Sequence, residues 1–228
     1  MLPLLYLGHR NYSSWSLRGW LALRWAGVRF DEQVLDLDQP GYGECRVADI
    51  VAVAPSGKVP ALRVGGVVIQ DSLAIAEWAA EQVPGALLPA GSLERAQVRS
   101  VVCEMHAGFA AVRRDLPMNI RRRTHAYDLP ADTLRDIARL DALFSGLREQ
   151  HAGAGPWLFG QRSLADAFFT PVATRFRSYG IVLSDPGAQY CAQLLSDAHF
   201  GAWEAQVLAE PAKPFSRGGV EAMYPPRA

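Results

Sequence analysis

Apolar and polar positions follow two different patterns along the chain. Residues 1–83 alternate short apolar runs with longer segments whose apolar residues recur at helical spacing. The short runs, which predict strands, are Leu4–Leu7, Phe30–Val34, Ala61–Val64 and Val67–Ile69. The longer segments, which predict helices, are Ser16–Trp25 and Ser72–Gln82. Gly65-Gly66 predicts a hairpin between the last two strands, so we expect a small mixed sheet covered by helices.

The second pattern is helical throughout. Pro84-Gly85 and the proline and glycine of residues 88–91 interrupt the periodicity and predict a linker. The segments beyond it with apolar residues every three and four positions are Glu94–Val112, Ala131–His151, Leu164–Tyr179 and Pro186–Glu210. We therefore predict an α/β domain at residues 1–83, a linker at 84–92 and an all-helical domain at 93–228.

Two segments lack clear periodicity. Asp38–Ala54 contains one proline and two glycines near its start, and we expect a mobile loop near the ligand. Pro211–Ala228 is rich in proline and glycine, which predicts an irregular tail that packs over the active site or frays.

The charge balance limits the classes of partner. Lys and Arg together number 23, as do Asp and Glu, so the formal net charge is zero and no overall field favours nucleic acid or an anionic membrane. No run of about 18 apolar residues suggests a membrane span. A polar segment follows from His9 where a signal peptide would be apolar. We expect a cytoplasmic chain whose partners are small molecules and a second copy of itself.

Cysteine and histidine positions give no sign of a disulfide framework or a metal site. Cys45, Cys103 and Cys191 are far apart and form no Cys-x-x-Cys pair, and the five histidines lack ligand spacing. The sequence therefore predicts no metal cofactor.

Residues 57–75 carry the most specific local signals. Val59-Pro60 precedes a predicted strand, and we interpret Pro60 as a turn proline, with a cis bond as one option, that leaves the Val59 backbone free to pair with an extended ligand. Asp71-Ser72 lies where a strand ends and a helix begins, so carboxylate, hydroxyl and backbone donors converge there. This combination suits the amino and carboxylate groups of a small peptide.

These signals resemble the glutathione-binding half of the glutathione transferase superfamily, which has a Val-Pro turn, a hairpin and an acidic-Ser pair opening a helix. The segment Ser13-Ser14-Trp15-Ser16-Leu17-Arg18 resembles the Ser-Ser-x-Ser-x-Arg motif of the zeta class, which includes maleylacetoacetate isomerases, and is most similar to bacterial zeta-like members. The resemblance is strong to about residue 90 and looser beyond. It implies a thioredoxin-like domain followed by a helical bundle, glutathione as co-substrate and a homodimer.

The resemblance implies that a hydroxyl near the first helix activates the glutathione thiol. Lowering a thiol pKa of ~8.5 by roughly two units requires about 2.7 kcal/mol. One charge-assisted hydrogen bond of about 1.5–3 kcal/mol plus a helix-dipole contribution of about 0.3–1 kcal/mol covers that range. We rank Ser13 first as the donor, Ser14 a close second and Tyr12 third; the alternative is that a serine only caps the helix.

The same resemblance implies roles for the other motif residues. Val59, held by Pro60, would bind the cysteinyl backbone of glutathione, Asp71 and Ser72 its γ-glutamyl end, and Lys58 a terminal carboxylate.

The acceptor pocket is expected between the two domains. Met105 and Phe109 share a helical face, although such a stripe is usually core. Asn119 and Arg121 follow Pro117, and an inward arginine would bind a carboxylated acceptor, the alternative being a solvated basic run. Trp15 stands where zeta enzymes carry cysteine, which puts an indole beside the pocket. Arg18 belongs to the serine motif, with a structural ion pair as an equal interpretation.

Farther along, Ser163 and Asp166 form a predicted capping box, which this superfamily places at a buried helix of its helical domain. The overall expectation is a serine-type glutathione S-transferase, of the kind used in detoxification, that attacks a small apolar electrophile. The alternatives are a glutathione-dependent cis-trans isomerase of the maleylacetoacetate type and a non-catalytic glutathione-binding or regulatory module.

Overall fold

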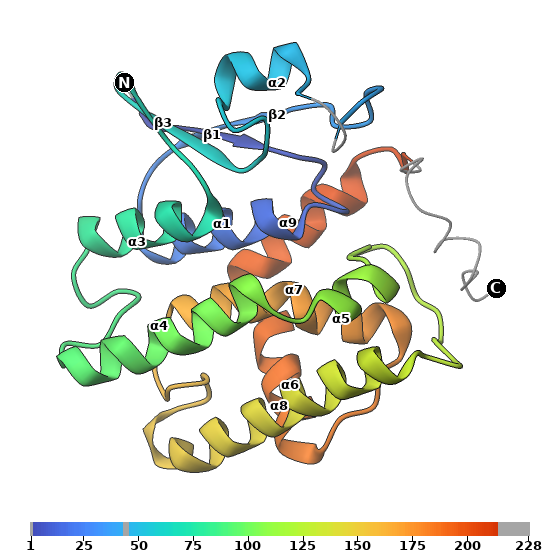
Figure 1. Cartoon of the computed structure of the whole chain (residues 1–228). Coiled ribbons are helices and arrows are strands. Elements are labelled where there is room, and N and C mark those ends of the chain that lie inside the picture. The colour runs from blue at the N-terminus through green and yellow to red at the C-terminus, as the bar shows by residue number, and fades with distance from the viewer. Residues whose placement is uncertain (1, 43–45, 214–228) are drawn as a thin grey trace.

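The computed structural model describes residues 2–42 and 46–213, and Figure 1 shows a sheet-containing half above a helical half. The elements of the first half are β1 (Leu4–Leu7), α1 (Ser14–Trp25), β2 (Asp31–Val34), α2 (Ala48–Val53), β3 (Ala61–Val64), β4 (Val67–Ile69) and α3 (Ser72–Gln82). The elements of the second half are α4 (Ser92–Ala107), α5 (Ala110–Asp115), α6 (Ala131–Gln150), a short 3-10 turn at Ala152–Ala154, α7 (Leu164–Tyr179), α8 (Asp185–Leu195) and α9 (Ala198–Ala209). All four predicted strands are confirmed.

The sheet is mixed, as the sequence predicted. Its strand order is β2-β1-β3-β4, with β1 parallel to β2 and antiparallel to β3, and β3 antiparallel to β4. The hairpin at Gly65-Gly66 joins β3 and β4, and Gly65 has φ +56°, a conformation that glycine adopts without steric cost. Helices α1 and α3 pack side by side between the sheet and the helical half (Figure 1). This is the mixed α/β arrangement of a thioredoxin-like domain, followed by a helical region.

One hydrophobic core runs through both halves. It joins Leu5 and Leu7 of β1 to Leu17 of α1 and to Phe168 and Phe169 of α7, all of them fully buried. Burying a side chain of this size contributes about 1.5–3 kcal/mol each, so the contact of α1 with α7 fixes the start of α1 against the helical half. The domain boundaries at 83 and 93 stay a prediction.

Three sequence expectations are wrong in detail. The predicted helix Glu94–Val112 is two helices, because Phe109 adopts a left-handed conformation with φ +57°. The predicted helix Pro186–Glu210 is also two, because Asp197 caps α9 by accepting hydrogen bonds from the amides of His199 (2.9 Å) and Phe200 (3.2 Å). The segment expected to be a loop, Asp38–Ala54, contains α2.

Two other expectations fall partly outside the described residues. Gly43 and Cys45 are outside the described residues, and so is all of the tail beyond residue 213. The first described residues of the tail contact the sheet half, because Lys213 pairs with Asp36 (3.1 Å).

The capping box is confirmed. The buried Asp166 carboxylate accepts hydrogen bonds from the Ser163 amide (2.7 Å) and hydroxyl (3.1 Å), the Leu158 amide (3.1 Å) and the Tyr190 hydroxyl (2.8 Å). Four donors satisfy a carboxylate that would otherwise be costly to bury. Asp166 therefore fixes the start of the buried helix α7 and has no part in the pocket described next.

In the described part of the chain, no helix combines the length and the apolar character that a membrane crossing requires.

Candidate functional site

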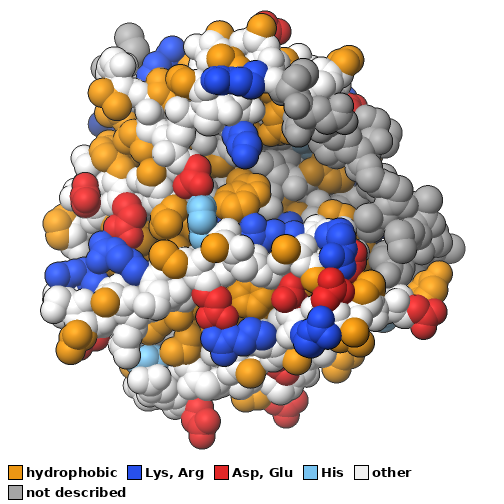
Figure 2. Space-filling model, viewed as in Figure 1, with side chains coloured by type: hydrophobic (Ala, Val, Ile, Leu, Met, Phe, Trp, Pro, Cys, Tyr) orange, Lys and Arg blue, Asp and Glu red, His pale blue; other side chains and the backbone are white. Residues whose placement is uncertain are grey.

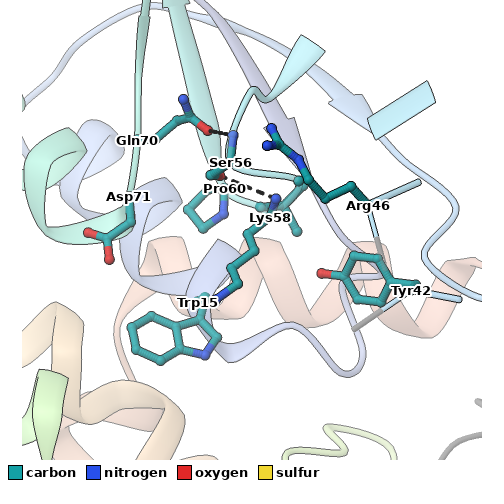
Figure 3. Close-up of a pocket in the computed structure, with 10 residues that line it drawn as sticks. Trp15, Tyr42, Arg46, Ser56, Lys58, Pro60, Gln70 and Asp71 are labelled. Carbon is teal, nitrogen blue, oxygen red and sulfur yellow. Dashed lines mark hydrogen bonds between the residues drawn. The ribbon is translucent and has the colours of Figure 1, made fainter. Parts of the chain in front are cut away.

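A pocket of about 820 Å³ opens beside the start of α1. Its walls come from four segments that are distant in sequence: the start of α1, the chain after β2, the turn before β3 and the end of β4. Figure 3 shows Asp71 at one end, Tyr42 and Arg46 at the other, and the Lys58 side chain extending toward Trp15. The predicted residues that line this pocket are Trp15, Lys58, Val59, Pro60 and Asp71.

The turn before β3 presents backbone groups to the pocket. The Val59-Pro60 peptide bond is cis, one of the options that the sequence left open. Hydrogen bonds from the Ser56 amide to Gln70 Oε1 (2.7 Å) and from the Lys58 amide to Ser56 Oγ (3.3 Å) hold the turn. Within the described residues, the Val59 backbone makes no hydrogen bond, so its amide and carbonyl are available to an extended ligand.

The start of α3 forms one end of the pocket. Asp71 Oδ1 accepts a hydrogen bond from the Leu73 amide (2.8 Å) and caps the helix, while Oδ2 lies 3.2 Å from His106 Nε2 of α4. Ser72 is fully buried, and its hydroxyl has no hydrogen-bond partner among the described residues. A helix N-terminus with an unpaired hydroxyl and a half-exposed carboxylate can bind both charges of an amino-acid end group.

The serines differ in their hydrogen bonds. Ser13 is the N-cap of α1: its Oγ accepts from the Ser16 amide (3.3 Å) and donates to Ser16 Oγ (2.7 Å). Ser14 is buried, and its Oγ accepts a hydrogen bond from Arg175 Nη2 (3.3 Å). The capping interpretation therefore fits Ser13, whereas the Ser14 hydroxyl hydrogen has no acceptor among the described residues. Neither serine lines the pocket, and the Tyr12 hydroxyl donates to the Lys213 carbonyl (3.0 Å).

The predicted acceptor residues lie elsewhere. Met105 and Phe109 are buried in the core, as the alternative interpretation held. Asn119 Oδ1 accepts a hydrogen bond from Asn11 Nδ2 (2.9 Å). Arg121 donates to main-chain carbonyls at the end of α9, including that of Leu208 (3.2 Å), and so caps this helix. None of these four side chains lines the pocket, and their role in acceptor binding stays a prediction.

Sequence reasoning missed a group of arginines around Trp15. The Arg18 guanidinium carbon lies 4.5 Å from the Trp15 ring centroid, and that of Arg113 lies 5.0 Å from it. Burial, and then repulsion from Arg113 and Arg175, lower the pKa of Arg18 well below its usual value. Burial lowers the pKa of Arg175 to about 10, with a smaller effect from Arg113. Both guanidinium groups are charged at neutral pH.

Arg18 was noted as part of the serine motif. Nothing in the sequence indicated that its Nε and Nη1 would be buried without a hydrogen-bond partner among the described residues. His106 was also missed, since a lone histidine on an amphipathic helix carries no specific pattern. It contacts the edge of Trp15 at 5.1 Å between ring centroids as well as Asp71, so it joins the two halves at the pocket.

Comparison with known proteins agrees with this geometry. A family model described as the glutathione S-transferase N-terminal domain matches residues 12–82. Maleylacetoacetate isomerase of Pseudomonas aeruginosa is 30% identical over 183 residues, which cover 78% of this chain and 84% of that protein. The chain belongs to the glutathione transferase superfamily. Probable maleylacetoacetate isomerase of Caenorhabditis elegans is 35% identical over 108 residues, about half of its length (48%).

Solved structures show the same fold. A zeta-class maleylpyruvate isomerase, described as a bacterial glutathione S-transferase in its holo form, has a TM-score of 0.69 at 24% identity over 92% of this chain and 100% of the other. A glutathione transferase homologue from Burkholderia with bound glutathione has a TM-score of 0.66 at 19% identity, with coverage of 92% and 100%. The predicted superfamily and its zeta-like character are confirmed.

In the described residues, no group of three or more His, Cys, Asp or Glu side chains is arranged to hold a metal ion.

Proposed function

We propose that this protein binds glutathione in the pocket beside α1 and activates its thiol as a nucleophile. The observation that carries the proposal is the meeting of three features at one pocket: the free Val59 backbone, the α3 N-terminus with Asp71, and the start of α1 with Trp15. The glutathione bound to the Burkholderia homologue supports the choice of ligand.

Glutathione is expected to lie along the pocket with its γ-glutamyl end at α3. Asp71, which lines the pocket, binds the α-amino group, and the N-terminus of α3, where the buried Ser72 hydroxyl has no partner among the described residues, binds the α-carboxylate. The Val59 amide and carbonyl pair with the cysteinyl residue, as a strand edge pairs with an extended peptide. Lys58 and Arg46 supply positive charge for the glycyl carboxylate, because both line the other part of the pocket.

We further propose Ser14, ahead of Ser13, as the hydroxyl that donates to the sulfur. Ser13 already uses its hydrogen in the bond to Ser16, while Ser14 accepts from Arg175 and keeps its own hydrogen. A hydroxyl that accepts from a cation is polarised toward stronger donation. The positive end of α1 adds to the preference for thiolate.

In conjugation, the sulfur electron pair forms a bond to an electrophilic carbon, and a leaving group departs or a proton is taken up. A second candidate is cis-trans isomerisation, favoured by the names of the Pseudomonas and Caenorhabditis relatives. The thiolate adds to one carbon of a double bond, rotation follows, and elimination returns both double bond and glutathione. The two candidates differ in whether glutathione is consumed.

The test is titration calorimetry with glutathione, followed by ultraviolet absorbance of the bound thiolate across pH. Asp71→Asn is expected to weaken binding about tenfold or more, because a charge-assisted bond to the amino group is lost. Asp132→Asn, an exposed acidic residue away from the pocket, is the matched control. Absence of glutathione binding by the intact protein refutes the proposal, and binding without a thiolate band identifies a binding module instead.

We also propose that the chain forms a homodimer in the cytoplasm, as the superfamily resemblance implies. The exposed side of α3 and α4 is the candidate interface; within the chain, Arg99 of α4 pairs with Glu77 of α3 there at 2.8 Å. Light scattering of the purified chain tests this assembly, and a monomer at micromolar concentration rules it out.

A further inference from the structure

The loop between β1 and α1 is linked to the helical half through Asn11. This side chain is only 2% exposed and lies three residues before Ser14. Its Nδ2 donates to Asn119 Oδ1 (2.9 Å), and its Oδ1 accepts a hydrogen bond from the Arg121 amide (3.0 Å). Its main-chain carbonyl accepts a third hydrogen bond, from the Ile120 amide (3.2 Å). One residue of the loop is thus joined three times to a short segment of the connection between α5 and α6.

The segment that Asn11 contacts is itself held by the last turn of α7. The Ser178 hydroxyl donates to the Asn119 carbonyl (2.7 Å), and the Tyr179 hydroxyl donates to the Pro117 carbonyl (3.0 Å). Ser178 is fully buried, so its hydrogen bond is shielded from competing water. Asn11 is therefore supported by the packed helical half.

Helix α7 also reaches Ser14 directly. Arg175 of α7 donates to Ser14 Oγ (3.3 Å), and it lies one helical turn before Ser178, on the same face of the helix. The main chain of the loop and the backbone of α7 close these hydrogen bonds into a circuit. The residues of the circuit are Ser14, Asn11, Asn119, Ser178 and Arg175.

The position of Ser14 depends on more than the packing of α1. Core contacts fix the axis of α1, but Ser14 is its first residue, and helix ends fray. The contact of its hydroxyl with Arg175 is long at 3.3 Å, so it restrains the hydroxyl only weakly. Ser14 also lies where the two halves meet, a junction at which Figure 2 shows Lys and Arg side chains bordering a hollow. The link through Asn11 supplies the restraint that the Arg175 contact lacks.

We propose that Asn11 is a positioning residue, which holds the Ser14 hydroxyl within hydrogen-bonding distance of the bound sulfur by linking the loop to the helical half. Asn11 is outside the pocket lining, and its side-chain amide uses both its donor and its acceptor within the chain. It therefore acts through Ser14 and not on the ligand. The assignment rests on the proposed function, in which Ser14 donates to the glutathione thiolate.

The test compares the thiol pKa of bound glutathione among variants of the full chain, measured by ultraviolet absorbance at saturating glutathione. Asn11→Ala removes both hydrogen bonds of the side chain. Ser178→Ala breaks the next link of the circuit and leaves Asn11 in place. Thr170→Val is the control, because it removes another buried hydrogen bond of α7, from the Thr170 hydroxyl to the Asp166 carbonyl (2.7 Å), which is outside the circuit.

Asn11→Ala is expected to raise the thiol pKa by about one, a tenfold loss of preference for thiolate, because a small misplacement of the donor weakens its hydrogen bond steeply. Ser178→Ala is expected to give a smaller rise, and Thr170→Val a change below about 0.3. In a Ser14→Ala background, Asn11→Ala is expected to have no further effect on the thiol pKa, since both changes act through one hydroxyl.

A purely structural role for Asn11 leads to a different pattern. Asn11→Ala then melts at a lower temperature, as Thr170→Val does, with the thiol pKa unchanged, and this result overturns the proposal. An equal rise of the thiol pKa with and without the Ser14 hydroxyl overturns it as well. If Asn11→Ala does not fold, the same comparisons with Ser178→Ala decide the question.

Amide hydrogen exchange of the unliganded protein separates this proposal from the proposed function. Asn11→Ala is expected to speed the exchange of the amides at residues 12–14 about tenfold or more, while Thr170→Val leaves them unchanged. Unchanged exchange in Asn11→Ala overturns the proposal whether or not glutathione binds. If the original protein binds no glutathione but exchange still depends on Asn11, the proposed function fails while the role of Asn11 in fixing the loop stands.

Discussion

The hydrogen bonds of the two adjacent serines lead to opposite expectations for their alanine variants. Ser14→Ala removes a hydroxyl whose hydrogen is available to a bound sulfur, and Ser13→Ala removes a helix cap whose hydrogen is already bonded to Ser16. A hydrogen bond to a charged group is worth about 1.5–3 kcal/mol, and one pKa unit corresponds to about 1.36 kcal/mol. We therefore expect Ser14→Ala to raise the pKa of bound glutathione by about one to two units.

Ser13→Ala is expected to act on stability instead. Loss of an N-cap costs about 1 kcal/mol, which in a chain of this size lowers the melting temperature by about 2–4 °C. The thiol pKa is expected to change by less than about half a unit, because Ser13 does not donate to sulfur. Ser14→Ala also leaves Arg175 without its hydroxyl acceptor, so some loss of stability accompanies its effect on the thiol.

The assay is the ultraviolet absorbance of thiolate as a function of pH, with the protein saturated by glutathione. Calorimetry fixes the saturating concentration for each variant, so that weaker binding is not mistaken for a higher pKa. Thermal melting of the same samples supplies the stability comparison. A raised thiol pKa in Ser13→Ala with an unchanged one in Ser14→Ala refutes the reasoning from hydrogen-bond direction.

Three further predictions concern the scaffold of the site. Burial raises the pKa of Glu32, but hydrogen bonds from Trp20, Arg10 and Arg24 outweigh it and hold that pKa below its ordinary value. The charged Glu32 therefore stabilises the folded chain above about pH 4.3, and this stabilisation is lost as pH falls through the lowered pKa. Denaturant unfolding should show Glu32→Gln to be less stable than the original protein by about 1–2 kcal/mol near pH 7 and equally stable in strong acid. Asp166→Ala leaves four buried donors unpaired and is expected to lose about 3–5 kcal/mol; a loss under about 1 kcal/mol contradicts the importance of the capping box. Gly8→Ala places a Cβ 2.5 Å from Leu37 Cδ1, 3.1 Å from Val59 Cγ2 and 3.2 Å from Ser13 Cβ, so these neighbours must shift. Calorimetry should therefore show weaker glutathione binding. Gly66→Ala is the control, because its Cβ meets nothing within 4 Å.

The elements of the fold follow from local patterns where those patterns are strong. The strands and the helix Ser72–Gln82 have alternation, capping residues and turn glycines within a few positions of one another, and all are found where expected. The errors occur where local periodicity continues across a break. The apolar spacing continues without a break past Phe109 and Asp197, although a helix ends near each of them. Tertiary contacts decide the break at Phe109, and the cap formed by Asp197 decides the start of α9.

The pocket proposed to bind glutathione was predictable for the same reason. Val59, Pro60, Asp71 and Lys58 lie within fifteen residues of one another, so a turn and a helix start suffice to bring them to one pocket. Ser13 and Ser14 were also indicated, but the sequence left their order open. Their difference depends on Arg175, more than 150 residues away, and on the rotation of Ser13 toward Ser16.

The acceptor side was harder to predict, and the role of Arg121 in acceptor binding stays a prediction. Arg121 stands in a visible basic run, yet the end of α9 supplies carbonyls that satisfy it. Arg18, Arg113 and Arg175 are single basic residues on three amphipathic helices, and each alone is typical of a surface or an ion pair. Only the contact of α1 with α7 and the break before α5 bring them together without acids. A basic run is easy to see in sequence because its members are adjacent, whereas an unpaired buried charge is defined by what is missing around it in space. That is why the sequence alone does not indicate that Arg18, Arg113 and Arg175 lie close together.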